Sequence, residues 1–149
     1  MNLLCQGESR FRVFRFTGKN PYWKANVDLF DDDPADDDRV RLLHEEVSSL
    51  YTKAFEIGIK LNAVASSELR LPQSSLELSF MISYVLDIPS DTKQRLLEMK
   101  STEERLSELV GHVEDVIRKL EQQLRQKTVL NKVRGNGDLG KPGTEASGG

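Results

Sequence analysis

A regular apolar repeat in the middle of the chain restricts the fold more than any other feature. Its residues are spaced alternately three and four positions apart, at Val40, Leu43, Val47, Leu50, Ala54, Ile57 and Leu61. This spacing predicts a helix about 33 Å long with one apolar side. That side must be covered by another helix of the same chain or by a second copy in a coiled coil. Because Tyr51 and Phe55 widen the stripe, we expect it to pack against the last helix of the same chain.

Three further helices are predicted after this repeat. The first covers residues 75–86, and a brief one covers residues 91–99. Ser101-Thr-Glu-Glu104 has the form of a capping box and opens a long final helix. The buried side of the final helix is expected at Leu106, Leu109, Val113, Val116, Leu120 and Leu124. We therefore assign residues 39–127 to a helical bundle subdomain.

Residues 1–30 have the pattern of an antiparallel sheet with about three strands, which we place at residues 2–5, 10–17 and 23–30. The last of these alternates cleanly between apolar and polar residues, as a half-buried strand does. In the middle strand the phase of the apolar residues changes halfway. Either a bulge shifts the phase there or both faces of the strand are covered. Three strands form a weak sheet unless another layer covers them.

The predicted fold class is therefore α+β: a partial antiparallel β subdomain with an acidic loop over residues 1–38, followed by the helices. The loop Asp31–Asp38 holds six Asp in eight positions, and we expect it to be solvated and to cap the following helix. It lacks the spaced oxygens and the Gly of a cation site, so no metal is predicted. Residues 128–149 are expected to form a disordered tail, because they have almost nothing to bury.

Composition narrows the compartment and the class of partner. A net charge of −3 gives no general attraction to nucleic acid, and no apolar run approaches the roughly 18 residues of a membrane span. The N-terminus lacks the basic and apolar parts of a signal peptide. The single cysteine, Cys5, excludes an internal disulfide framework. These features predict a cytoplasmic protein that binds neither nucleic acid nor membranes.

We recognise no catalytic constellation and no cofactor site in the sequence. Residues 135–141 match the spacing of a P-loop, but Pro142 stands where a magnesium-binding hydroxyl is required, and no strand precedes the motif. His44-Glu45 begins like a zinc-protease helix, but Ser48 replaces the second histidine. We therefore expect a protein without enzymatic activity, cofactor or metal.

Aromatic residues gather in the predicted sheet, beside several arginines. For any single aromatic residue, the simplest interpretation is a place in the core of the sheet, with the arginines at its rim. Taken together, however, these residues are the chain's one candidate surface for binding a peptide or an exposed apolar segment. They hold five of the ten aromatic residues of the chain: Phe11, Phe14, Phe16, Tyr22 and Trp23.

The same segments, in this order, resemble the N-terminal domain of Lon-type proteases, over about residues 2–126. The resemblance depends on short motifs at the right spacing. They are Cys5-Gln6-Gly7 for a Q-G turn, Arg10-Phe-Arg12-Val13 for an R-x-R-V strand, Pro21-Tyr22 for a P-Y step, Leu86-Asp-Ile-Pro89 for a D-L-P step, residues 93–98 for an E-K-Q-x-L-L-E segment and residues 102–106 for V-x-E-R-L.

This resemblance implies a PUA-like β-barrel subdomain followed by a helical subdomain. Family members begin with further strands and a P-L-F-P-like segment, so we expect Met1 to be an internal or late start and the barrel to be only partly encoded. Full-length members continue into an AAA+ ATPase and a protease with a Ser–Lys dyad, and neither is recognised in this sequence. The chain thus resembles a stand-alone, truncated member of the family.

The function that the resemblance implies is non-enzymatic binding of unfolded or damaged polypeptide segments in protein quality control, alone or with a protease or chaperone. The aromatic patch would hold such a segment by apolar contact, or an open sheet edge would accept it as an added strand. Two alternatives stay open. One is an ATP-dependent peptidase-related protein, and the other is a coiled-coil module for self-association.

Overall fold

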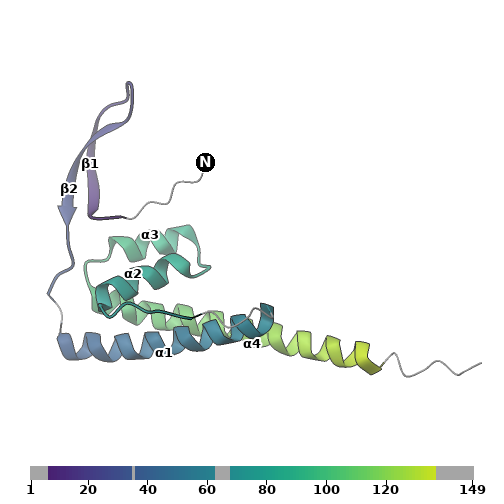
Figure 1. The fold of residues 1–149 in the computed structure, drawn as a ribbon. Coiled ribbons are helices and arrows are strands. Elements are labelled where there is room, and N and C mark those ends of the chain that lie inside the picture. Colours follow the sequence, from purple (N-terminus) through teal and green to yellow (C-terminus); the bar gives the residue numbers. More distant parts are fainter. Residues whose placement is uncertain (1–6, 35, 63–67, 137–149) are drawn as a thin grey trace, which may run out of the picture.

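The computed structural model describes the chain apart from residues 1–6, 35, 63–67 and 137–149, and its fold is α+β, as predicted. A hairpin of β1 (Arg10–Gly18) and β2 (Lys24–Phe30) comes first. The helices follow as α1 (Asp37–Asn62), α2 (Ser75–Val85), α3 (Ser90–Glu98) and α4 (Thr102–Asn136). Helices α1 and α4 lie side by side, α2 packs against both of them, α3 lies beside α2, and the hairpin rises from one end of the helices (Figure 1).

The core lies between the four helices. Its buried apolar side chains are Val47, Ala54, Ile57, Leu78, Ile82, Leu86, Leu96, Leu106, Leu109, Val113 and Ile117. The residues from α1 belong to the predicted apolar repeat, and they meet α4 of the same chain, so the prediction of intramolecular packing is confirmed. On α4 the predicted stripe needs one correction. Ile117 is buried and Val116 only partly so, because a period of 3.6 residues turns the helix slightly at each repeat.

Short polar side chains begin three of the helices, two of them where the sequence predicts a cap. Ser101 Oγ accepts a hydrogen bond from the Glu104 backbone N–H at 3.1 Å, as expected for the capping box before α4. Asp36 in the acidic loop accepts one from the Asp38 N–H at 3.1 Å and so caps α1. Ser74 does the same for α2. Each cap satisfies a backbone donor that has no partner within the helix.

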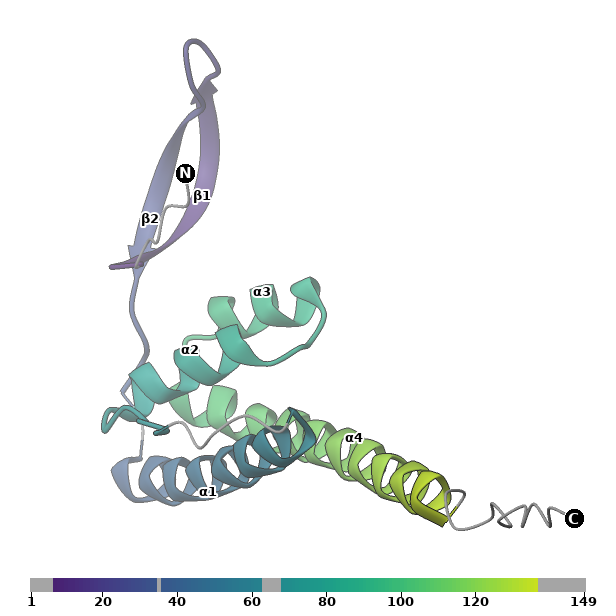
Figure 2. The same cartoon turned by 45° about the vertical axis from the view of Figure 1, so that its right-hand side comes forward.

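The hairpin is antiparallel, and its register shifts twice, between Val13 and Arg15 and between Phe16 and Gly18. The first shift leaves Phe14 as an extra residue on β1, which is the bulge that the change of phase in the sequence suggested. In the connection between the strands, the Asn20–Pro21 peptide bond is cis. Figure 2 shows that the hairpin projects well beyond the helices, so that most of its length stands apart from the core.

Two predicted boundaries differ from the structure. The sheet has two strands among the described residues where about three were predicted, and the predicted strand at residues 2–5 lies outside the described residues, as does Cys5. Helix α4 continues past Lys127 to Asn136, because the residues up to Gly135 contain no helix breaker. Of the tail predicted at 128–149, residues 137–149 are not described. None of the described helices combines the length and the apolar character needed to cross a membrane.

Candidate functional site

The register of the hairpin gives it one apolar face. Phe11 lies opposite Leu29, Val13 opposite Val27, and Phe16 opposite Ala25, and residues that are directly opposite each other share a face. Trp23 joins this surface through an edge-to-face contact with Phe16, with ring centroids 5.3 Å apart. We call this surface the apolar face of the hairpin: Phe11, Val13, Phe16, Trp23, Ala25, Val27 and Leu29.

The apolar face is open to solvent. The five aromatic residues predicted as a candidate patch are all exposed, from 57% for Phe11 to 78% for Phe14. They therefore do not form a sheet core, which was the simpler interpretation of each residue alone. Phe11, Phe16 and Trp23 belong to the apolar face, Phe14 lies at the bulge, and Tyr22 lies in the connection between the strands. Whether this patch binds a peptide stays a prediction.

Aliphatic residues that the predicted patch omitted extend the apolar face. Val13 is 41% exposed, Val27 43% and Leu29 72%. The alternation of residues 23–30 already placed Val27 and Leu29 on the same side as Trp23, so the sequence contained the signal. Val13 was harder to place, because its position relative to Phe16 depends on the bulge at Phe14.

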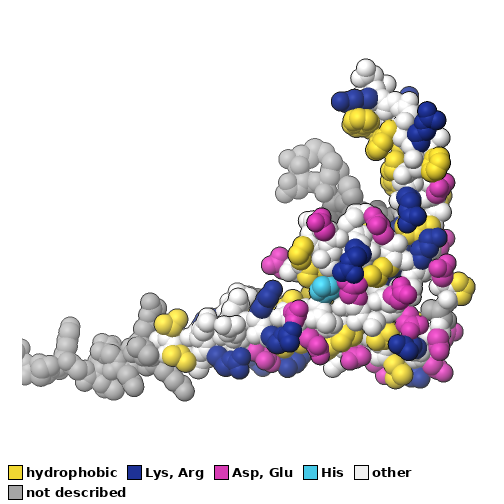
Figure 3. All heavy atoms as spheres, turned by 180° about the vertical axis from the view of Figure 1, so that it is seen from behind, with side chains coloured by type: hydrophobic (Ala, Val, Ile, Leu, Met, Phe, Trp, Pro, Cys, Tyr) yellow, Lys and Arg dark blue, Asp and Glu magenta, His cyan; other side chains and the backbone are white. Residues whose placement is uncertain are grey.

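The opposite face of the hairpin is basic. Arg10, Arg12, Arg15 and Lys24 lie there, opposite Phe30, Asp28, Asn26 and Gly18 respectively. We call this surface the basic face. Near the tip, Lys19 Nζ lies 5.0 Å from the centroid of the Trp23 ring, and Lys24 Nζ lies 5.2 Å from that of Tyr22. Figure 3 shows hydrophobic and basic side chains together on the projecting hairpin, with most acidic ones over the helices.

A polar network joins the foot of the hairpin to the helices. Asp32, which follows β2, accepts hydrogen bonds from Arg10 of β1 and from Thr102 and Arg105 of α4. The Arg105 Nη2–Asp32 Oδ2 distance is 2.5 Å. The Arg105 side chain is completely buried, and its Nε donates to Ser79 Oγ of α2 at 2.8 Å. Three parts of the chain that are distant in sequence therefore meet at one carboxylate.

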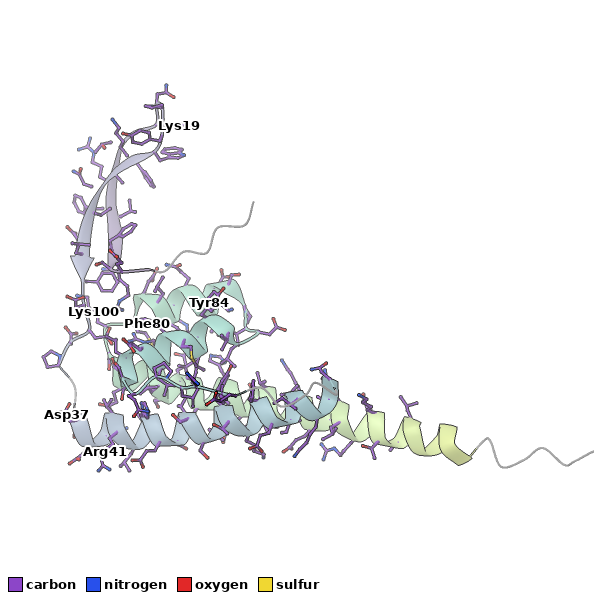
Figure 4. All side chains as sticks on the ribbon, viewed as in Figure 1. Lys19, Asp37, Arg41, Phe80, Tyr84 and Lys100 are labelled. Atoms are coloured by element: carbon purple, nitrogen blue, oxygen red, sulfur yellow. The ribbon has the colours of Figure 1, made fainter. Side chains whose placement is uncertain are left out.

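The network has two arginines, Arg10 and Arg105, and one carboxylate. The carbonyl oxygens at the C-terminal end of α3 accept hydrogen bonds from both arginines. Arg10 Nη1 donates to the carbonyl oxygens of Leu97 at 3.1 Å and Met99 at 2.6 Å, and Arg105 Nη1 donates to that of Met99 at 2.9 Å. The last carbonyls of a helix lack partners within it and carry partial negative charge. The Phe80 ring centroid lies 4.0 Å from Arg105 Cζ and 5.0 Å from Arg10 Cζ. Figure 4 shows Phe80 on α2 at the foot of the hairpin.

Burial and charge oppose each other at Asp32. Burial by itself raises the pKa of this carboxyl, but the hydrogen bonds from Thr102 and Arg105 and the charges of Arg105 and Arg10 outweigh it. The pKa of Asp32 therefore lies below its ordinary value, and the group is a carboxylate at neutral pH. Burial lowers the pKa of Arg105, and the bond to Asp32 opposes that effect. This network was missed in the sequence, where Asp32 was expected to lie in a solvated loop.

The remaining polar groups that the sequence suggested have structural contacts. His44 Nδ1 on α1 lies 3.2 Å from Ser75 Oγ of α2, and His112 Nε2 lies 3.3 Å from Glu108 Oε1 one turn earlier on α4. In the part of the chain that the structure describes, no three His, Cys, Asp or Glu side chains gather as a metal site would require. Most of the P-loop-like segment at 135–141 lies outside that part.

This arrangement suits binding by contact. The apolar face offers aromatic and aliphatic side chains to a partner, the sheet offers backbone groups at its edges, and the network sets the direction of the hairpin. Arg105 could have been noticed in the sequence, because it precedes Leu109 and Val113 on the same side of α4 at steps of four residues. Its partner Asp32 carries no such signal within a run of six Asp.

Comparison with known proteins relates the chain to a family of protease domains. The family described as the ATP-dependent protease La (LON) substrate-binding domain matches residues 1–115, which include the hairpin, the network and the first part of α4. The Lon protease of Syntrophus aciditrophicus (strain SB) is 25% identical over 108 residues, which are 72% of this chain and 14% of the relative. The similar region is thus a small part of that relative. Arg10 and Arg105 of the network both lie within the matched residues.

Proposed function

Because the chain belongs to the family of Lon protease substrate-binding domains, we propose that it is a non-catalytic module that binds unfolded or damaged protein segments in protein quality control. One observation carries this proposal. The apolar face of the hairpin is exposed to solvent, whereas the helices bury a core of their own. An exposed apolar surface of this kind marks a site of interaction with another polypeptide.

The physical reason is the free energy of burial. Covering a side chain such as Phe16 or Leu29 contributes about 1.5–3 kcal/mol when it becomes fully buried. An unfolded segment exposes the apolar side chains that a folded protein largely conceals, so it has more apolar surface with which to cover this face. The network at Asp32 holds the hairpin in place, so less conformational freedom is lost on binding.

Further parts of the proposal rest on the family resemblance and on composition. The hairpin would correspond to part of a PUA-like barrel, and the helices to the helical subdomain that follows it. The module would act in the cytoplasm, which suits a chain with a single cysteine. It would present bound segments to a protease or chaperone, because relatives of this family carry the domain within proteases.

A binding assay with a protein that cannot fold tests the proposal directly. The probe is a reduced, carboxymethylated protein, and its native form serves as the negative control. The double variant Phe16→Ser, Leu29→Ser should weaken binding to the unfolded probe by at least about tenfold, since both side chains are exposed in the apolar face. The matched control is Leu42→Ser, Val129→Ser, which removes two side chains of comparable exposure from the helices.

Equal affinity of both double variants for the unfolded probe would show that the hairpin is not the binding surface. A separate assay addresses catalysis: the purified chain is incubated with the unfolded probe, with and without ATP. We expect no cleavage in either case. Cleavage that disappears on substitution of a single residue of this chain would overturn the non-catalytic assignment.

A further inference from the structure

The hairpin differs in charge from the rest of the chain. Residues 8–30 contain five Lys and Arg and two Asp and Glu, so the hairpin has a net charge of +3 within a chain of net charge −3. Opposite charges attract even at exposed sites, although each such pair contributes little. A segment that binds the hairpin is therefore favoured when it carries acidic residues.

The two edges of the sheet present this charge differently. A strand added beside β1 would have alternate side chains next to Phe11, Val13 and Phe16 on the apolar face. Its other side chains would lie next to Arg12 and Arg15 on the basic face. A strand added beside β2 would instead meet Asn26 and Asp28 there. Only the β1 edge thus pairs an apolar row with a row of arginines.

Among the described residues, the outer edge of β1 has no pairing strand, and its two exposed arginines have no carboxylate partner. In the described part of the sheet, β1 pairs with β2 on one side only, so its other side has backbone groups to offer. Arg12 and Arg15 are exposed. Within the described ranges, no carboxylate lies within salt-bridge distance of either, although Asp28 is opposite Arg12 in the register. Arg10, by contrast, is engaged by Asp32.

We infer that the outer edge of β1 accepts an extended polypeptide segment in which apolar residues alternate with Asp or Glu. This inference rests on the proposed function and names the class of segment that the module selects. Backbone hydrogen bonds to β1 would hold the segment, as in other cases of strand addition. Its apolar side chains would extend the apolar face, and its carboxylates would pair with Arg12 and Arg15 across the opposite face.

Single-stranded nucleic acid fits this surface less well. Binding of that kind combines stacking aromatic rings with a groove of cations that follows the phosphates. Here Phe11, Phe16 and Trp23 lie on one face, whereas Arg12 and Arg15 lie on the other. The aromatic rings also share their face with Val13, Val27 and Leu29, which suit an apolar side chain rather than a base.

Fluorescence anisotropy with labelled peptides of nine residues, the length of β1, tests the inference on the full chain. The first peptide alternates Val and Glu, the second alternates Val and Lys, and the third has the composition of the first with Val and Glu in separate blocks. The Val–Glu alternating peptide should bind at least about tenfold more tightly than either of the others, and higher salt should narrow that difference. A single-stranded oligodeoxythymidine is the fourth probe.

Two charge-removing variants locate the edge. Arg12→Gln, Arg15→Gln should weaken binding of the Val–Glu peptide about three- to tenfold. Lys19→Gln, Lys24→Gln removes the same charge from the connection and from β2 and should change it less than about twofold. Arg12→Lys, Arg15→Lys keeps the charge and should restore most of the affinity. Equal weakening by both Gln variants would overturn the assignment to the β1 edge.

The failure of this inference is distinguishable from the failure of the proposed function. All three peptides could bind alike while Phe16→Ser, Leu29→Ser still weakens binding of the unfolded protein. The inferred selection of acidic segments would then be wrong, and the proposed binding of unfolded segments would stand. If neither the peptides nor the unfolded protein bind, both are wrong. Tighter binding of the oligodeoxythymidine than of the Val–Glu peptide, lost in Arg12→Gln, Arg15→Gln, would replace the inference with nucleic-acid binding.

Discussion

The helical bundle and the hairpin place their apolar residues in opposite environments. In the bundle, Val47, Leu78 and Leu109 are completely buried, and the core includes residues from all four helices. In the hairpin, most of the apolar face is exposed, and among the described residues only the foot of the hairpin contacts the helices, through the network at Asp32. The buried apolar core therefore lies in the bundle, and the exposed apolar face lies in the hairpin.

This difference shows how a small sheet can be held in place by contacts at one end, without a core packed against its face. A two-stranded hairpin is marginally stable by itself in water. Here one end of it is fixed by charged hydrogen bonds from Arg10 to Asp32 and to the end of α3. The buried Arg105 holds Asp32 from the side of the helices. The four predictions that follow test this division between the two regions.

The largest effect on stability is expected from Arg105, where the two regions meet. The substitution Arg105→Met leaves Asp32 without its buried partner, and such a loss costs about 3–5 kcal/mol in the free energy of unfolding. Urea denaturation followed by circular dichroism measures it. Arg118→Met is the matched control, since Arg118 pairs with Asp115 at the surface of the same helix, and it should change stability by less than about 0.5 kcal/mol. Equal effects of the two would contradict the role of the network.

A core substitution in the bundle should come next. Leu109→Ala removes a completely buried side chain between α1 and α4 and should lower the free energy of unfolding by about 3 kcal/mol. Leu42→Ala on the exposed side of α1 is the control and should have little effect. The same denaturation experiment compares them. A small effect of Leu109→Ala would mean that the bundle is not the stable region.

Acid should weaken the junction by a smaller amount. Because the pKa of Asp32 lies below its ordinary value of 3.8, its contribution to stability is complete above that value and is lost as the pH falls through the lowered pKa. The variant Asp32→Asn lacks this contribution at every pH. The difference in unfolding free energy between the two proteins should therefore shrink as the pH falls from about 7 to about 3. A difference that stays constant would show that the ionised carboxylate does not stabilise the junction.

The smallest effect on stability is expected from the apolar face itself. Leu29→Thr should change the free energy of unfolding by less than about 0.5 kcal/mol, because the side chain is 72% exposed. Its affinity for an unfolded protein should nevertheless fall, and anisotropy with the carboxymethylated probe measures that loss. A loss of stability as large as that of Leu109→Ala would mean that the hairpin has a core after all, and the division between the regions would fail.

Much of the helical region follows from the sequence. The apolar repeat of α1, the cap at Ser101 and the starts of α2 and α3 depend on residues that are close together in the chain, so local rules suffice to place them. The alternation in β2 is equally local, and the change of phase in β1 correctly suggested the bulge at Phe14. The end of α4 was predicted too early, at Lys127, because the apolar stripe that packs on the core fades after Leu124.

The candidate site was only partly accessible to such reasoning. The five aromatic residues were recognised as a group, but the sequence favoured a buried position for each, because aromatic residues in a strand are usually covered. Val13 joined the surface only after the bulge had set its register with Val27. The network escaped notice because its partners are up to 89 positions apart, as in the bond from Arg10 to the Met99 carbonyl oxygen.

The sequence by itself determined which stretches become helices and strands and which of their sides are apolar, because both follow from the spacing of residues along the backbone. Only the tertiary structure decided which apolar sides are covered. The apolar stripe of α1 packs against α4, whereas no layer covers the apolar face of the hairpin among the described residues. The tertiary structure also decided which of the six Asp in residues 31–38 is paired, since only the Asp32 carboxylate lies within hydrogen-bond distance of the buried Arg105. Burial and pairing depend on what the rest of the chain brings near a residue, and local spacing does not contain that information.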